Sequence, residues 1–380
     1  MGKSLKGKEL GVGISQRKDG LYQARFTNRF GKRQTIYAKT VTEITKKLRE
    51  EQYRNEKQIN IVNPNMTLDE WFEQWITICK KHCRNTTLRT YRIQYERLRG
   101  ELGWRKLSNL NLVILQSAFN NLKSDASRSD CRALLIDMLN RAIESDLLVK
   151  NVAYGIKTKL NNDDYVEKRI LSTEEVKILL NTKKGCCFQN FLIVALGTGM
   201  RMGEILGLTW DCIDFQNNII KVRKTLTYLP NNGEAIYEFH KPKTKAGKRD
   251  IPMINDVKIA LLSQQTWKNS VSERHEPKIG MENLVFCSKT NNPINETNIR
   301  RALDYLTNKI NEENPMLRLQ HFTPHGLRHT FATNCIEKGM RPKTLQKILG
   351  HNSLQMTMDL YCHVTNSTLK EEMQLIDEVV

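Results

Sequence analysis

The sequence lacks the features of secreted, membrane and disulfide-stabilised proteins. Its nine cysteines form no Cys-x-x-Cys pair and no regular spacing, which is typical of reduced thiols in a cytosol. The longest apolar runs, such as 191–196, are far shorter than the roughly 20 residues that cross a bilayer. No apolar stretch follows the opening Met-Gly-Lys-Ser-Leu-Lys, as it would in a signal peptide. We therefore expect a cytoplasmic protein that has no membrane partner.

Acidic residues are few relative to basic ones. The 380 residues include 60 Lys and Arg but 41 Asp and Glu, for a net charge of +19, and a hydrophobic content of 39% suffices for folded cores. The net charge is +9 in residues 1–65, +4 in 66–156 and +6 in 157–380. A polyanion that touches every segment, such as nucleic acid, explains this spread better than one binding patch. Solubility alone is the alternative.

The length predicts two or three domains, of which the first is small. Short β-like runs at 11–16, 21–27 and 32–37 are separated by turn-forming residues, and a charged helix is predicted over 42–57. The stretch 59–65 contains a proline and is typical of an exit linker.

The second segment is predicted to be helical throughout. Residues 67–70, Thr-Leu-Asp-Glu, form a capping box that opens its first helix. Asn85 and the next two residues can cap a second helix, and residues 128–147 carry the apolar stripe of an amphipathic helix. The other side of that helix presents arginines that are either solvated or in contact with DNA: Arg128, Arg132 and Arg141.

A polar, aperiodic stretch at 161–164 predicts a linker, and a capping box at 172–175 opens a larger third unit. This unit is predicted to begin with helices and to return to helices after about Asn298. Three strands are predicted between them, near 219–224, 237–240 and 249–252.

Arg201 is the first candidate for chemistry. It follows a helix that glycines interrupt, so its guanidinium lies on a tight turn beside helix-terminal amides, where anions bind well. A rigid guanidinium suits two phosphate oxygens. The alternative is a structural pair with Glu204.

A second candidate group opens a later helix. Thr323 is a predicted N-cap and Pro324 occupies the first helical position, so His325 and Arg328 share one helix face at i and i+3. His325 and His329 have a spacing that zinc ligands use. We expect no metal, however, because no acidic residue lies between them and no cysteine has ligand spacing.

Three further residues complete the set. His351 follows Leu-Gly, and Tyr361 lies ten residues later. Lys243 lies in a basic turn that is expected to form the tip of a hairpin between two predicted strands, and Lys245 and Lys248 in the same turn are competing assignments. Two arginines, two histidines, a lysine and a tyrosine can cut a phosphodiester without a metal, because guanidiniums neutralise the transition state and a tyrosine hydroxyl attacks phosphorus.

The order of these residues resembles the tyrosine recombinase (phage integrase) family. Residues 198–204, Thr-Gly-Met-Arg-Met-Gly-Glu, are similar to its first arginine box, and residues 324–333 to its second. Residues 349–351 and 358–363 resemble its closing elements. The resemblance covers roughly 170–370, and the three-stranded start is most like integrases of conjugative transposons.

The resemblance implies the catalytic roles. Arg201 and Arg328 would hold the scissile phosphate, and Tyr361 would attack it to leave a 3′-phosphotyrosine. Lys243 would protonate the leaving 5′ oxygen, and His325 would act as an acid or base. His351 would be a phosphate ligand, and Glu204 would orient Arg201 or His325. Because the covalent bond conserves energy, strand exchange would need no cofactor.

The resemblance also implies a multidomain α+β fold with four parts. These are an arm-site module with a three-stranded sheet (1–62), an all-α core-binding domain (66–156), a linker (157–167), and a mainly α catalytic domain with a small antiparallel sheet and a C-terminal tail helix (168–380). The predicted DNA contacts are Gln23, Arg25, Thr27, Arg33, Tyr37, Arg89, Arg92, Arg128, Arg132 and Lys245.

The implied partners are double-stranded DNA at core and arm sites, three further copies of the chain, an excisionase and host DNA-bending proteins. The implied location is the bacterial nucleoid. A type IB topoisomerase and a catalytically inactive DNA-binding relative are the alternatives.

Overall fold

The computed structural model describes residues 2–5, 7–27, 33–56, 63, 65–159, 169–182, 187–231, 234–314, 316 and 318–361. The chain divides into two compact units, Met1–Asp164 and Tyr165–Val380, and the division falls inside the linker predicted at 157–167. The predicted C-terminal tail helix lies outside the described residues.

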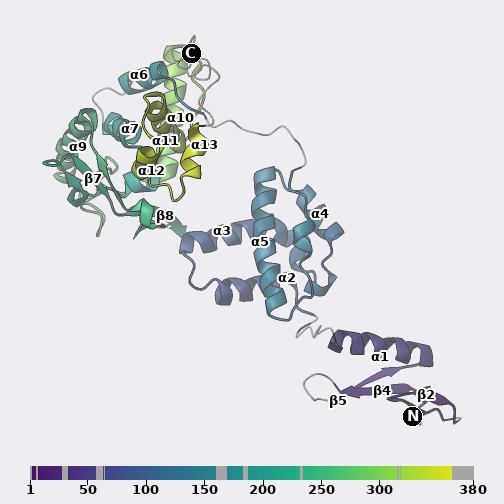
Figure 1. The fold of residues 1–380 in the computed structure, drawn as a ribbon. Helices are drawn as coiled ribbons and strands as arrows, with labels where there is room; N and C mark the ends of the chain where they lie inside the picture. Colours follow the sequence, from purple (N-terminus) through teal and green to yellow (C-terminus); the bar gives the residue numbers. More distant parts are fainter. Residues whose placement is uncertain are drawn as a thin grey trace, which may run out of the picture. The chain divides into compact units, whose positions relative to one another are not determined.

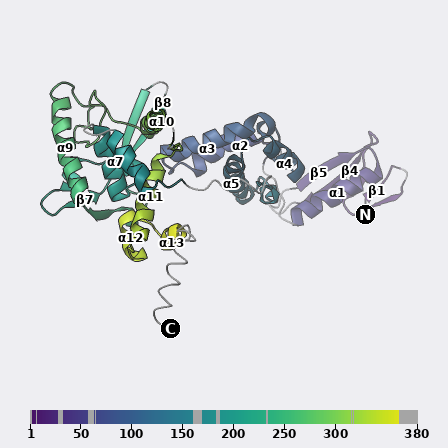
Figure 2. The same cartoon turned by 90° about the horizontal axis from the view of Figure 1, so that it is seen from above.

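The first unit begins with a small antiparallel sheet that one helix covers. The sheet has the order β3-β4-β5, and the helix α1 packs against β4 and β5 (Figure 2). Ala24 from the sheet and Ile44 and Leu48 from the helix form the buried layer between them. The predicted module of three strands and one helix is confirmed, and a short strand pair that was not predicted precedes it. The bounds are β1 (Gly2–Lys3), β2 (Glu9–Gly11), β3 (Ile14–Gln16), β4 (Tyr22–Thr27), β5 (Arg33–Ala38) and α1 (Val41–Glu56).

The remainder of the first unit is helical and has a hydrophobic core of its own. Its predicted capping box is confirmed, because Thr67 Oγ1 accepts from the Glu70 amide at 3.2 Å and Glu70 Oε2 accepts from the Thr67 amide at 2.8 Å. The predicted cap at Asn85 is wrong by one residue, since Arg84 precedes the first helical turn and makes no side-chain cap. The bounds are α2 (Leu68–Gln74), π-helix η1 (Trp75–Cys79), α3 (Asn85–Leu98), π-helix η2 (Arg99–Gly103), η3 (Leu107–Asn109), α4 (Leu112–Asn120), α5 (Asp125–Glu144) and η4 (Val152–Gly155).

Arg128 on α5 does not lie on an exposed face. It is 8% exposed, and its guanidinium donates to the carbonyl oxygens of Phe119 at 3.1 Å and Leu122 at 2.6 Å. It also pairs with Asp125. Arg128 therefore donates to carbonyl groups in the last turn of α4 and just after it. The expectation that Arg128 lies on the outer arginine face of this helix is wrong, because its guanidinium is buried against the end of α4 and the turn after it.

The second unit is mainly helical, as predicted. Its central helix, α7, lies between α9 and α11 (Figures 1 and 2). The core around it includes Phe191 and Leu192 from α7, Leu261 from α9 and Leu327 from α11. Among the described helices of the chain, none is both long enough and apolar enough to cross a membrane. The bounds are α6 (Thr173–Thr182), α7 (Cys187–Thr198), α8 (Met202–Leu206), α9 (Asn255–Ser272), α10 (Glu296–Glu313), α11 (Pro324–Glu337), α12 (Pro342–Leu349) and α13 (Gln355–Tyr361).

Two small antiparallel sheets interrupt these helices. One has the order β10-β7-β6, and the other pairs β8 with β9. The three predicted strands are present, but β6 and β8 were not predicted. The basic segment 241–248 was expected at a hairpin tip, and this is wrong: it joins β9 to β10, which belong to different sheets. The bounds are η5 (Trp210–Cys212), β6 (Ile213–Asp214), β7 (Ile219–Val222), β8 (Thr225–Asn231), β9 (Glu234–His240), η6 (Lys245–Gly247) and β10 (Arg249–Pro252).

Candidate active site

Arg201 lies at the N-terminus of α8, directly after a left-handed turn at Gly199. Gly199 has φ +59°, and a Cβ added there would lie 2.3 Å from Phe331, so only glycine lets the end of α7 approach α11 this closely. Glu204 holds Arg201 twice, accepting from its amide at 2.9 Å and from its Nη1 at 3.0 Å. Arg201 Nη2 donates to the Gly350 carbonyl at 3.2 Å. The pairing with Glu204 is therefore confirmed, and it orients the guanidinium without covering it, since the Arg201 side chain is 39% exposed.

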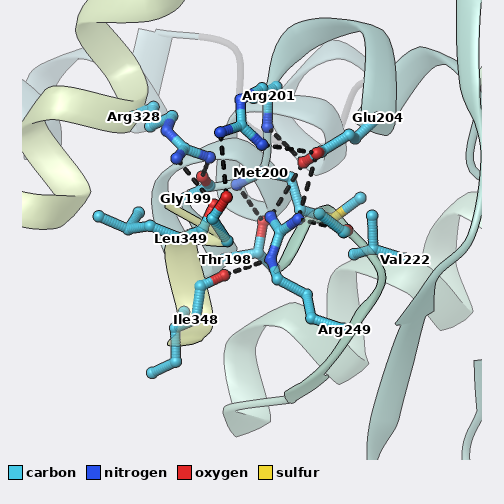
Figure 3. Close-up of polar contacts among 12 residues, drawn as sticks. Thr198, Gly199, Met200, Arg201, Glu204, Val222, Arg249, Arg328, Ile348 and Leu349 are labelled. Atoms are coloured by element: carbon cyan, nitrogen blue, oxygen red, sulfur yellow. Dashed lines mark hydrogen bonds and ion pairs between the residues drawn. The ribbon is translucent and has the colours of Figure 1, made fainter. Parts of the chain in front are cut away.

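Arg249 holds Glu204 from the other side, and the sequence reading did not single it out. Its Nη1 and Nη2 donate to the two Glu204 oxygens at 3.1 and 2.9 Å, and its Nε donates to the Ile348 carbonyl (Figure 3). Burial raises the pKa of Glu204, but the hydrogen bonds and charge of Arg249, together with Arg201, outweigh burial and lower it. Arg249 and Ile251 share the buried face of β10, and this period of two is the signal that could have placed Arg249 inside.

Arg328 reaches the same place from α11. The predicted start of this helix is confirmed, because Thr323 Oγ1 accepts from the Gly326 amide at 3.2 Å. Arg328 is 4% exposed and donates to the carbonyls of Gly199 at 2.7 Å and Leu349 at 2.8 Å. Burial and then the charge of Arg201 lower the pKa of Arg328 to about 9, so it remains protonated at neutral pH. Both arginines thus converge on the carbonyls that end α12 (Figure 3).

His351 follows this helix end. Gly350 has φ +66°, and a Cβ there would lie 2.8 Å from the Ala246 carbonyl, so the basic segment 241–248 packs directly against the turn. His351 is 8% exposed, and its Nδ1 lies 2.9 Å from Thr357 Oγ1. Burial, followed by the charge of Arg328 and other nearby arginines, lowers the pKa of His351 to about 4. Its imidazole is therefore neutral at pH 7.

A cavity of about 180 Å³ joins several of these residues. Its lining includes His325, Arg328, His351 and Asp359. The ring of His325 contacts that of His329 edge-on, with centroids 4.6 Å apart. The structure thus confirms that His325 and Arg328 face one site and places His351 beside them.

The other two predicted catalytic residues, Tyr361 and Lys243, belong to segments that contact the elements of this site. Tyr361 is the last residue of α13, and this helix contacts α11 and α12. Lys243 is exposed in the segment 241–248, whose other end contacts Gly350.

The predicted polar residues of the first sheet share one face. The register pairs Gln23 with Tyr37, Arg25 with Thr35, and Thr27 with Arg33, and these residues alternate with those that pack under α1. The Arg17 guanidinium lies 5.4 Å from the centre of the Tyr37 ring on this face. The face with these polar residues is therefore the one that α1 leaves uncovered.

The remaining predicted DNA contacts differ in exposure. Arg89 and Arg92 on α3 and Lys245 in the basic segment are exposed. Arg132 is partly buried and donates to the Tyr154 carbonyl at 2.8 Å.

The second unit is mainly helical, and in it two arginines and two histidines converge beside a helix that ends in a tyrosine. This arrangement defines the tyrosine recombinase class. A model described as the phage integrase family matches residues 168–368. The chain is 29% identical to the transposase from transposon Tn1545 of Streptococcus pneumoniae, over 98% of this chain and 96% of the relative. It is 28% identical, over the same shares, to the transposase from transposon Tn916 of Enterococcus faecalis.

Solved structures agree with these relatives. The Tn1549 transposon integrase in complex with transposon right-end DNA matches with a TM-score of 0.69 and 27% identity, over 82% of this chain and 100% of that chain. A lambda integrase dimer bound to a core site has the same fold, with a TM-score of 0.57 and 17% identity over 93% of this chain and 95% of that chain. The chain belongs to the phage integrase family, and its similarity to the transposases of Tn1545 and Tn916 extends over nearly its whole length.

Proposed function

We propose that this recombinase cuts and rejoins DNA strands through a 3′-phosphotyrosine on Tyr361, without a metal ion, and thereby integrates and excises a mobile element. The observation that carries the proposal is the convergence of Arg201 and Arg328 on the end of α12, next to the helix that ends in Tyr361. A site with this much positive charge binds a phosphodiester and has no need of an added cation.

The arginines act on the phosphate. Arg201 and Arg328 donate to its non-bridging oxygens and neutralise the negative charge that grows in the transition state. Glu204 and Arg249 hold Arg201 in place, so that its orientation is set before DNA binds.

Covalent chemistry then proceeds in one displacement. The Tyr361 hydroxyl attacks phosphorus, its proton passes to His325, and the P–O5′ bond breaks as the new P–O bond to tyrosine forms. Lys243 protonates the departing 5′ oxygen. Neutral His351 donates a hydrogen bond to the phosphate. The phosphotyrosine retains the energy of the original bond, so a 5′ hydroxyl from another strand can reverse the step.

The rest of the chain binds DNA. Residues 1–62 use the face with Gln23, Arg25, Thr27, Arg33 and Tyr37 to read an arm site in the major groove. Residues 66–156, through Arg89 and Arg92, and the catalytic domain, through Lys245, hold the core site. Four copies act on two DNA sites through a Holliday junction, with an excisionase and host DNA-bending proteins, in the bacterial cytoplasm. The fold of a lambda integrase tetramer bound to a Holliday junction, at a TM-score of 0.54, supports this assembly.

Substitution of the nucleophile tests the proposal. Tyr361→Phe removes one hydroxyl, so binding to a nicked core half-site should be nearly unchanged while the covalent protein–DNA species that survives SDS disappears. The wild-type protein should form this species equally well in EDTA. An adduct formed by the phenylalanine variant would assign the nucleophile to another residue.

A further inference from the structure

A buried hydrogen bond connects the phosphate site to the helix of the nucleophile. Thr357 lies on α13, four residues before Tyr361, and its side chain is 0% exposed. Its Oγ1 lies 2.9 Å from Nδ1 of His351, which is itself 8% exposed. Two polar atoms removed from water need each other as partners, so this contact is required by both side chains.

The direction of the bond follows from the chemistry of the imidazole. A neutral histidine carries one proton, and therefore has one nitrogen that donates and one that accepts. Phosphate oxygens only accept, so the nitrogen that faces the phosphate must carry the proton. Nδ1 is occupied by Thr357, which leaves Nε2 for the phosphate. The threonine hydroxyl must then donate to an unprotonated Nδ1.

We propose that Thr357 is a positioning residue that holds His351 in the Nε2–H tautomer and couples the phosphate site to the helix of Tyr361. The proposal rests on the role of His351 as a phosphate ligand. Without the hydroxyl, His351 can carry its proton on Nδ1, which would turn a lone pair toward the phosphate.

The same bond positions the nucleophile. α13 has only seven residues, and so short a helix depends on its contacts with the rest of the protein. One such contact is apolar, between Leu360 and the cluster of Ala332, Ile336, Leu345 and Leu349. The hydrogen bond from Thr357 adds a directional contact, which fixes the rotation of α13 relative to His351.

Three matched variants test the role in catalysis. Thr357→Val keeps the volume but removes the hydroxyl, and Thr357→Ser keeps the hydroxyl. Thr307→Val is the control, because Thr307 on α10 is equally buried and its hydroxyl has no partner among the described residues. We expect Thr357→Val to lower the rate of covalent half-site cleavage by roughly tenfold, the equivalent of one hydrogen bond, with DNA affinity unchanged. Thr357→Ser and Thr307→Val should cleave like the wild type.

The tautomer is measured separately by ¹⁵N NMR of histidine-labelled full-length protein, with His351→Gln used to assign the signal. We expect Nε2–H in the wild type and in Thr357→Ser, and a mixture of tautomers in Thr357→Val. An unchanged tautomer in Thr357→Val, or equal cleavage defects in the valine and serine variants, would overturn the proposal. A shifted tautomer with wild-type cleavage would instead overturn the role of His351 as a phosphate ligand, and with it this proposal.

Discussion

At the scale of single residues, the positively charged side chains of the site outnumber the negatively charged ones. Arg201 and Arg249 share one carboxylate, that of Glu204. The hydrogen bonds of the buried Arg328 to described residues go to carbonyl oxygens. Burying such charge costs free energy, and a phosphate in the site would recover part of that cost. The arginines are therefore placed to stabilise the transition state, and their burial lowers the stability of the protein without DNA.

Replacing the forked guanidinium of Arg201 tests whether this arginine stabilises the transition state. Arg201→Lys keeps the charge but cannot contact two oxygens at once. We expect covalent cleavage to fall by about 10²-fold, as when one donor to a developing oxyanion is removed. DNA binding, measured by gel shift, should change far less, because many basic residues hold the backbone. Arg300→Lys, on an exposed ion pair of α10, is the control. Equal losses of binding and cleavage would make Arg201 an ordinary contact.

The low pKa of His351 predicts a stability that depends on pH. The pKa is about 4 in the folded protein, below the ordinary value of 6.5. The unfolded chain therefore takes up a proton first, and the stability due to neutral His351 is complete above about pH 6.5 and is lost as the pH falls toward 4. We expect the wild type to lose on the order of 2 kcal/mol more than His351→Gln between pH 7 and 5, from urea unfolding. Parallel losses in the two proteins would contradict the low pKa.

At the scale of elements, the basic segment 241–248 is held at one end and exposed at the other. Gly247 donates to Thr244 Oγ1 at 3.2 Å, and its carbonyl accepts from Arg249 at 3.2 Å. Lys243 and Lys245 are exposed.

A modified substrate identifies the lysine that acts as the general acid. Sulfur at the bridging 5′ position is a leaving group that needs no proton, so it should restore cleavage by Lys243→Ala. Lys248→Ala should cleave ordinary DNA like the wild type, and any loss in Lys245→Ala should lie in core-site binding, which the sulfur substrate does not restore. If the sulfur substrate restored cleavage by Lys245→Ala instead, the general acid would be Lys245 and not Lys243.

At the scale of the whole molecule, the sheet module of the first unit has a core separate from that of the helical remainder. We assign the sheet module to the arm site, and the helical remainder and the second unit to the core site. The sheet of the first unit exposes only one face, because α1 covers the other. A DNA site read by that face is separable from the chemistry of the second unit.

Two arginines on opposite sides of the sheet module provide a matched test. Arg25→Ala, on the uncovered face, should weaken binding to arm-site DNA while cleavage of a core half-site is unchanged. Arg49→Ala, on α1, should leave both activities at the wild-type level. Equal arm-site binding by both variants would show that this face does not read DNA.

The sequence by itself determined the features that depend on neighbouring residues. The capping box at Thr67, the N-cap at Thr323 and the alternating faces of the first sheet all rest on spacings of a few residues, and the structure has each of them. These features are predictable because hydrogen bonds within one helical turn and the periods of helix and strand do not depend on the rest of the chain.

Only the tertiary structure decided which distant groups meet. Glu204 and Arg249 are 45 residues apart, and in the sequence Arg249 is one more cation in a basic run. Arg128 looked like a surface arginine, and β9 and β10 looked like two arms of one hairpin. Long-range pairing of this kind depends on how whole elements pack, because a buried charge takes whichever partner the fold brings within hydrogen-bonding distance.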